Sequence, residues 1–254
     1  MYVIHLLVFC LLYEPIYQIS FSSGMIPLQR RLLESTDYFT ASSEYIVSTN
    51  PDNPNSVFAI DLDGDGDIDV LVASIRDDTV AWYENNGAES FTEHIITSSA
   101  DSARSVFAID MDGDGDIDIV VASKRDDTVA WWENNGSESF TEHIVTTSAG
   151  GANSVFAIDL DGDGDIDLAC TYLDDNTVAW WENNGSESFT EHILTSSATG
   201  AISVFAIDVD NDGDIDILSA ANTISWWENN GTESFTQHVI SSDILDATSI
   251  FAID

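Results

Sequence analysis

The sequence predicts an all-β fold, a partial β-propeller of four four-stranded blades with one additional strand at each end. Three observations predict it. A unit of about 49 residues recurs along the chain, each unit contains four strand-like runs separated by turns, and the second run of each unit is apolar on nearly both faces. Four strands in 40–50 residues is typical of propeller blades, which pack between two neighbours. A β-solenoid is the alternative, although its repeats are shorter.

The repeat is marked by the string SVFAID, which returns at its last copy as SIFAID. The copies begin at residues 56, 105, 154, 203 and 249. The last interval is shorter because VVASKRDDTVAWW of the second unit becomes LSAANTISWW in the fourth, which places a three-residue deletion in a turn. The blades are therefore predicted at 56–104, 105–153, 154–202 and 203–248, with 249–254 as the start of a truncated fifth.

The first unit shows the four strands of a blade. They are predicted at 56–60, 68–74, 79–84 and 90–96, because these runs are rich in Val, Ile, Phe, Trp and Thr and carry no helical period. Asn86-Gly87 marks a hairpin turn, since both residues accept positive φ. The unit is thus a meander of antiparallel strands.

The two ends of the repeat region indicate a longer propeller. EYIVST at 44–49 is expected to be an orphan fourth strand, and 249–254 an orphan first strand. We expect the chain to be a fragment, or a truncated gene product, of a longer propeller, with a closed four-bladed ring as the alternative. The propeller region is therefore placed at 44–254.

The N-terminal region is predicted to lie outside the fold. Residues 3–13 form an apolar run too short to span a bilayer, followed by small residues at 22–24, which is typical of a signal peptide. We expect a signal peptide at 1–24, a linker at 25–43, and a mature chain that is secreted or on the cell surface without membrane insertion. No Lys or Arg precedes the apolar run, so an extra apolar segment at a misassigned start is the alternative.

Composition favours cations as partners. The chain has 46 acidic residues against 6 Lys and Arg, for a net charge of -40, which repels nucleic acids and anionic membranes. An evenly acidic, halophile-like surface does not explain the pattern, because 20 of the acidic residues lie in four short stretches. The two cysteines, Cys10 and Cys170, exclude a disulfide framework, and Cys170 is expected to be a small buried residue.

The acidic stretches follow the pattern D-x-D-x-D-G-x-x-D, which predicts a calcium site. Calcium binds six to eight oxygens, and alternate carboxylates in a tight loop with a glycine at the turn supply them. The loop is similar to the first half of an EF-hand, but Val72 stands where an EF-hand has Glu and the flanks are strands. Magnesium fits less well, and an aspartate-rich solvated turn is the structural alternative.

We name these stretches the aspartate loops, at 61–69, 110–118, 159–167 and 208–216. Position nine is expected to close the coordination shell, with the carbonyl of Asp67 as backbone ligand; Asn211 replaces a glycine in the fourth loop without removing the site. The candidate metal ligands are Asp61, Asp63, Asp65, Asp67, Asp69, Asp110, Asp112, Asp114, Asp116, Asp118, Asp159, Asp161, Asp163, Asp165, Asp167, Asp208, Asp210, Asp212, Asp214 and Asp216.

With these residues the unit resembles the FG-GAP/VCBS-type repeat, which forms the propeller head of integrin α-subunits and occurs in many secreted or surface proteins. The resemblance covers about residues 44–254 and is specific in the aspartate loops, which in that family bind calcium. Phe58-Ala59 replaces the Phe-Gly of the family name, and VASIRDD stands where Gly-Ala-Pro is expected. The resemblance therefore implies a VCBS-type calcium-binding propeller and leaves an integrin-like ligand role open.

Other polar and aromatic positions recur with the repeat. His94, His143, His192 and His238 occupy one equivalent position, which favours a structural role over catalysis. The pairs at 82–83, 131–132, 180–181 and 226–227 are expected to pack between blades, with sugar stacking as the alternative. Asn135, Asn184 and Asn230 begin glycosylation sequons that the turn itself also explains.

The expected function is that of a calcium-binding adhesion or protein-interaction scaffold outside the cell, without enzymatic activity. A carbohydrate-binding or accessory module of a larger secreted enzyme is the alternative. The expected partner is a protein or glycan ligand, and nucleic acid is excluded by charge.

Overall fold

The computed structural model describes residues 46–88, 90–186, 188–242 and 247–253. The predicted signal peptide and linker lie outside these residues. The chain divides into two compact units, Met1–Glu44 and Tyr45–Asp254, and all described residues belong to the second. Within the described part, no helix is long and apolar enough to span a membrane.

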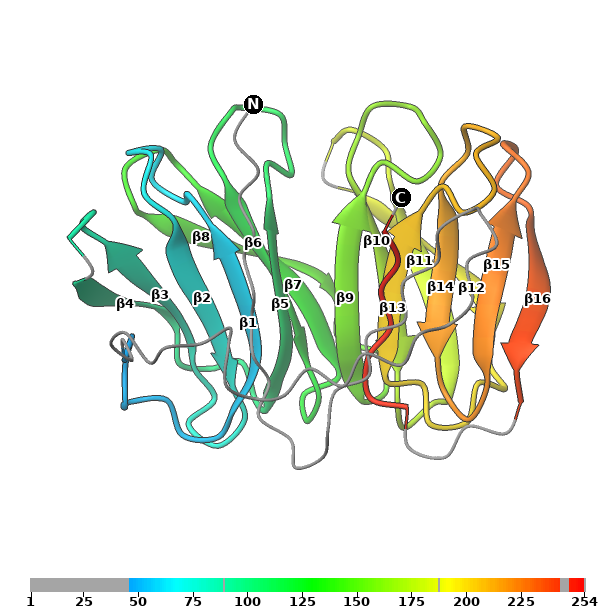
Figure 1. The fold of residues 1–254 in the computed structure, drawn as a ribbon, viewed down its shortest axis with the longest axis horizontal. Helices are drawn as coiled ribbons and strands as arrows, with labels where there is room; N and C mark the ends of the chain where they lie inside the picture. The colour runs from blue at the N-terminus through cyan, green and yellow to red at the C-terminus, as the bar shows by residue number, and fades with distance from the viewer. Residues whose placement is uncertain (1–45, 89, 187, 243–246, 254) are drawn as a thin grey trace, which may run out of the picture. The chain divides into compact units, whose positions relative to one another are not determined.

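The described residues form four antiparallel four-stranded sheets, each with its strands in sequence order (Figure 1). This confirms the predicted all-β partial propeller with meander blades. The strands are β1 (Pro54–Ile60), β2 (Asp69–Ser74), β3 (Val80–Asn85) and β4 (Phe91–Thr97) in the first blade; β5 (Ala103–Ile109), β6 (Asp118–Ser123), β7 (Thr128–Asn134) and β8 (Phe140–Thr146) in the second; β9 (Ala152–Ile158), β10 (Asp167–Tyr172), β11 (Thr177–Asn183) and β12 (Phe189–Thr195) in the third; and β13 (Ser203–Ile207), β14 (Asp216–Ala220), β15 (Ile224–Asn229) and β16 (Phe235–Ser241) in the fourth.

Neighbouring blades meet along their first strands. β1 contacts β5, β5 contacts β9, and β9 contacts β13. One phenylalanine from each first strand packs against the phenylalanine of the neighbouring blade. The ring centroids of successive residues lie 4.7 Å apart in a tilted arrangement, in the order Phe58, Phe107, Phe156 and Phe205. Such tilted aromatic pairs stabilise the contact beyond the area they bury. The phenylalanine of each SVFAI strand therefore joins its blade to the next.

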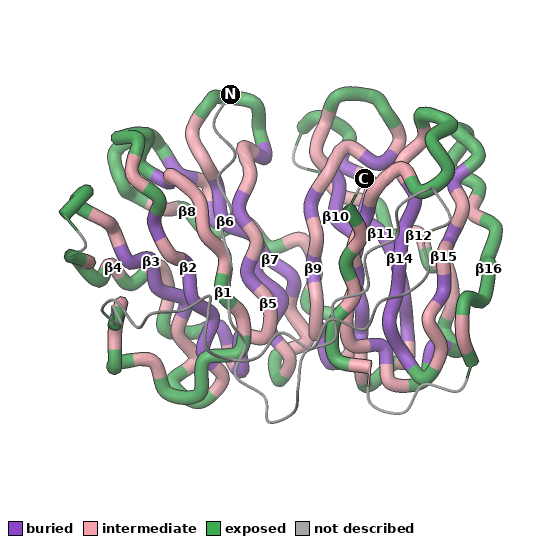
Figure 2. Tube along the Cα trace, viewed as in Figure 1, coloured by how far each residue is buried: buried purple, intermediate pink, exposed green. Residues whose placement is uncertain are grey.

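The core lies between the blades. β6 is buried at every position, and Figure 2 shows buried segments along β2, β6 and β14, with exposed loops and an exposed β16. Trp82 and Leu71 of the first blade share one apolar cluster with Ala108 and Ile119 of the second. A strand that packs on both faces must be apolar on both, which explains the pattern seen in the sequence.

The shortened fourth unit places its deletion in the predicted turn. β14 and β15 are joined by residues 221–223, where the N–H of Ala221 donates to the carbonyl of Thr223 at 2.9 Å, whereas residues 124–127 join the equivalent strands of the second blade. The hairpin tightens, and the sheet order is unchanged.

The two predicted end strands are not formed in the described residues. No strand is assigned to 46–50, although Val47 packs against Val72 and Tyr83, nor to 247–253. The N–H of Ile250 donates to Oγ of Ser203 at 3.2 Å, the same bond that links successive blades. Strand assignment requires a backbone ladder, and this segment is held through a side chain, which explains the difference.

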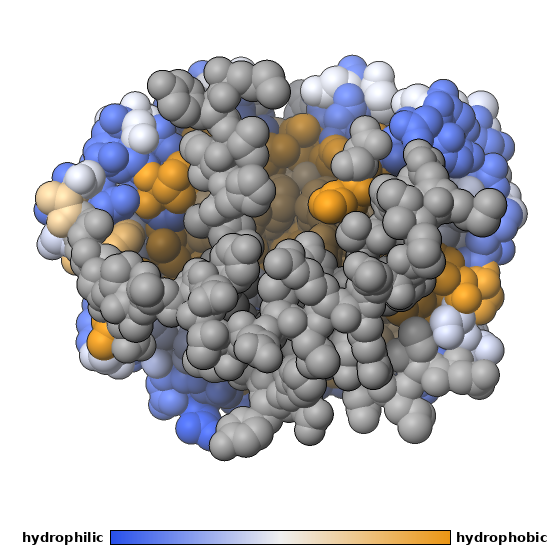
Figure 3. Space-filling model, viewed as in Figure 1, coloured by the Kyte–Doolittle hydropathy of each residue, from blue (hydrophilic) through white to orange (hydrophobic). Residues whose placement is uncertain are grey.

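The face of the molecule drawn in Figure 3 carries both the polar and the apolar residues that the composition contains. In Figure 3, hydrophilic side chains cover much of the left and right edges of the view, and apolar side chains show in its middle. Cys170 is fully buried as predicted, and burial raises the pKa of its thiol.

Candidate metal centre

Each aspartate loop connects the first and second strands of its blade. The first loop takes two backbone conformations that favour glycine, with φ of 76° at Gly64 and 96° at Gly66. Asn211 stands in the place of Gly64 in the fourth loop and adopts the same left-handed region, with φ of 63°. Asparagine tolerates this region better than most residues, so the fourth loop keeps the turn as predicted.

The first loop wraps around the carboxylate of Asp61. Its Oδ1 accepts the N–H of Gly64 at 2.9 Å, and its Oδ2 accepts the N–H of Gly66 at 3.0 Å. Oδ1 of Asp63 accepts the N–H of Asp65 at 3.1 Å. Because backbone N–H groups fix these carboxylates, the alternate aspartates turn inward as the loop closes. The same bonds recur in the other three loops.

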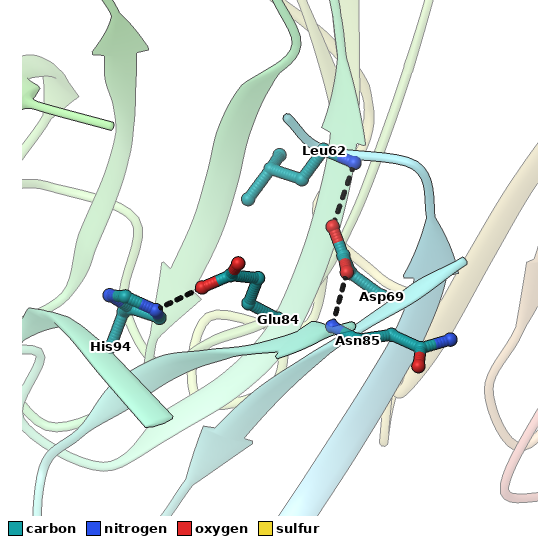
Figure 4. A network of polar contacts seen from close by, with 5 residues as sticks. All are labelled: Leu62, Asp69, Glu84, Asn85 and His94. Atoms are coloured by element: carbon teal, nitrogen blue, oxygen red, sulfur yellow. Dashed lines mark hydrogen bonds and ion pairs between the residues drawn. The ribbon is translucent and has the colours of Figure 1, made fainter. Parts of the chain in front are cut away.

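Asp69 is the buried end of the loop. Its side chain has no exposed surface; Oδ2 accepts the N–H of Leu62 at 3.1 Å, and Oδ1 accepts the N–H of Asn85 at 2.7 Å (Figure 4). One carboxylate thus joins the end of β1, the start of β2 and the end of β3. The equivalent residues, equally buried, are Asp118, Asp167 and Asp216.

Positions one, three and nine of each loop converge. One carboxylate oxygen from each lies within 4.8 Å of the others. The four triads are Asp61, Asp63 and Asp69; Asp110, Asp112 and Asp118; Asp159, Asp161 and Asp167; and Asp208, Asp210 and Asp216.

Positions five and seven lie outside these triads. Oδ1 of Asp65 accepts the N–H of Asp67 at 2.8 Å. The carboxylate of Asp67 lies against Gly87, so closely that a Cβ on that glycine would come 2.3 Å from Oδ2. The same position-seven contact is made by Asp116 with Gly136, Asp165 with Gly185, and Asp214 with Gly231. The remaining position-five residues are Asp114, Asp163 and Asp212.

The environment of the triads disfavours charged carboxylates. Burial raises the pKa of Asp118 and of Asp167 to about 7, although two backbone N–H groups oppose the shift at each. Burial, and then neighbouring carboxylates, also raise the pKa of Asp63, Asp112 and Asp161. A positive charge placed among these oxygens offsets both effects.

The donor set fits a hard divalent cation. Every converging ligand is a carboxylate oxygen, and such sets favour Ca²⁺, Mg²⁺ or Mn²⁺ over softer metals. Calcium binds such oxygens at 2.3–2.6 Å and magnesium at about 2.0–2.1 Å. In each triad one oxygen per residue lies within 4.8 Å of the others, close enough for the three carboxylates to share one such ion.

Supporting residues lie beside each loop. Nε2 of His94 lies 2.8 Å from Oε2 of Glu84, and its ring stacks on Trp82 at 4.5 Å. The same pair and stack recur in all four blades, as the predicted structural role requires. Trp82, Trp131 and Trp180 are each only 1% exposed, so packing accounts for the aromatic pairs of the first three blades, whereas the equivalent Trp226 is half-buried.

Sequence reasoning missed Asn85. Its N–H binds Asp69, its Nδ2 donates to the carbonyl of Ile68 at 3.0 Å, and its Oδ1 accepts the N–H of Gly87 at 3.2 Å. It ties the hairpin turn to the aspartate loop. The recurrence of Asn before Asn-Gly in each unit was the available signal.

Comparison with known proteins identifies the repeat. Residues 61–121, 110–170 and 159–219 match the family model of the FG-GAP-like repeat. No curated protein matches the chain.

Two solved structures are similar in fold. A protein from Lactobacillus plantarum aligns with a TM-score of 0.55 and 14% identity over 77% of this chain and 57% of its own length. A functionally unknown protein from Desulfotomaculum acetoxidans aligns with a TM-score of 0.50 and 16% identity over 71% of this chain and 55% of its own. The chain thus spans little more than half of each.

Proposed function

Because the chain belongs to the FG-GAP-like repeat family, we propose that it is a calcium-binding propeller module that serves as an extracellular adhesion or protein-interaction scaffold. One observation carries the proposal: the same triad of converging carboxylates recurs in all four blades. A hard divalent cation is the partner that this donor set favours, and we propose calcium because it accepts sites built from protein oxygens more readily than magnesium, which usually retains its waters.

The proposed role of calcium is structural. Asp69 already connects three strand ends through its hydrogen bonds, and an ion held by Asp61, Asp63 and Asp69 fixes the loop on that connection. The rim of aspartate loops becomes rigid, and the surrounding surface is presented to a partner. The module acts by binding and not by catalysis, in a secreted or surface-attached protein where calcium is abundant.

A protein partner is favoured over a glycan partner. The large indole faces that stack on sugars are buried at Trp82, Trp131 and Trp180, and only the equivalent Trp226 is half-buried. The alternative of a carbohydrate-binding module makes a different prediction, namely selective, saturable sugar binding.

Two measurements test the proposal. Thermal unfolding in millimolar calcium and in excess EDTA should differ, with the higher melting temperature in calcium, because an ion that binds only the folded state stabilises it. A glycan array probed with and without chelator should show no selective binding. Identical melting curves in calcium and in EDTA would contradict calcium binding. Selective, saturable sugar binding would favour the carbohydrate-binding module over the protein-interaction scaffold.

A further inference from the structure

A glutamate from the second blade faces the aspartate loop of the first. Glu138 lies in the turn between β7 and β8, and it lines a pocket of about 130 Å³ together with Asp61 and Asp63. The pocket therefore lies between two blades, and it has room for several water molecules. Carboxylates enter it from both sides, from the loop of one blade and the turn of the next.

The same arrangement is found between the third and fourth blades. Glu233 occupies in the fourth unit the position of Glu138 in the second, in the turn between β15 and β16. Asn229 ends β15 just before this turn, and its Nδ2 donates to the carbonyl of Leu160 in the third aspartate loop at 3.1 Å. The turn that carries Glu233 is therefore held against the third aspartate loop.

An unpaired donor borders the same pocket. Trp82 lines it, and the indole Nε1 of Trp82 is buried without a hydrogen-bond partner in the described part of the chain. Trp82 is 1% exposed, and a buried N–H without a partner is costly. The wall of the pocket thus contains a polar group that the described residues themselves do not satisfy.

The turn adopts an unusual backbone conformation at the glutamate. Both Glu138 and Glu233 lie in the left-handed region, with φ of 58° and 57°. For a residue other than glycine this conformation is unfavourable. A free solvated glutamate does not require this conformation, and the two copies share it.

We propose, on the basis of the calcium-binding function above, that Glu138 and Glu233 complete the ion sites of the preceding blades. Each supplies a further carboxylate, through the water that fills the inter-blade pocket, to the ion held by the first or the third aspartate loop. Calcium binding then joins adjacent blades in addition to fixing one loop.

Calcium titration of the full chain by calorimetry tests whether the two glutamates contribute to the ion sites. The double variant Glu138→Gln/Glu233→Gln should lose about tenfold or more in affinity at two of its sites, as expected when a carboxylate that supports a metal site is removed. The matched control is Glu89→Gln, the same residue in the first unit, which follows no aspartate loop in this sequence. It should titrate like the unchanged chain. Equal melting temperatures in EDTA verify that all three proteins are folded.

Hydrogen exchange tests the joining of blades. Calcium should slow amide exchange in residues 134–140, and Asp63→Asn should reduce that protection although the substitution lies in the neighbouring blade. Protection in 110–118 should stay unchanged.

The outcomes distinguish calcium binding by the aspartate loops from the inter-blade role of the two glutamates. If the unchanged chain takes up calcium and the double variant titrates identically to it, the inter-blade role is overturned and calcium binding stands. If the unchanged chain takes up no calcium, both are overturned.

Discussion

The carboxylate of Asp69 accepts the backbone N–H of Asn85 at 2.7 Å, sixteen residues further along the chain. With its second bond, to Leu62, it makes the aspartate loop part of the hydrogen-bonded frame of the blade. The metal centre and the fold therefore share a residue.

Asp69→Asn should destabilise the first blade even without calcium. An amide has one acceptor oxygen, so one of the two backbone N–H groups loses its partner, at a cost of about 1–3 kcal/mol when it is buried. Urea unfolding in EDTA measures this cost. Asp65→Asn is the control, because Asp65 accepts a single bond that an amide oxygen can keep. Equal losses for both variants would contradict the role given to Asp69.

Gly87→Ala should destabilise more than Gly64→Asn. Gly87 has φ of 69°, and a Cβ there would meet Asp67 at 2.3 Å, so the substitution adds a steric clash to conformational strain. Gly64 has open space around its Cβ direction, and Asn211 already occupies its place in the fourth loop. We expect a loss of about 1 kcal/mol or less for Gly64→Asn and a clearly larger loss for Gly87→Ala. Thermal unfolding of both variants in EDTA checks the order, and the reverse order would refute the packing described for Asp67.

Ser154→Ala should weaken the contact between the third and fourth blades. Oγ of Ser154 accepts the N–H of Val204 at 3.3 Å, and Val204 is buried. Losing the acceptor should cost about 1 kcal/mol or more. Ser203→Ala removes the same bond to Ile250, which is only half-buried, so water replaces the acceptor and the loss should be smaller. Denaturant midpoints compare the two, and equal midpoints would argue against a buried inter-blade bond.

The fold was predictable because the sequence signals for strands, for packing between blades and for hairpin turns recur in every unit. SVFAI, the doubly apolar second run and Asn-Gly each recur in every unit, and together they specify strand positions, blade packing and turns. The strand boundaries agree closely with prediction; the first strand, for example, was placed at 56–60 and forms at Pro54–Ile60.

The internal arrangement of the aspartate loop was less predictable. Spacing alone identified five aspartates, but it could not separate those that converge from Asp65, which caps a backbone N–H, and Asp67, which packs on Gly87. That separation depends on where the hairpin turn of β3 and β4 folds back, which is a tertiary contact. The contribution of Asn85 and the inter-blade position of Glu138 depend on tertiary packing for the same reason.

Calorimetric titration of the full chain with calcium tests the central claim most directly. We predict uptake of about four ions per chain, one for each aspartate triad, and a stabilisation of about 2.7 kcal/mol per site when free calcium is one hundred times the dissociation constant. The absence of any heat of binding, together with unfolding that is unchanged by calcium, would contradict the claim that these carboxylates converge to hold a cation.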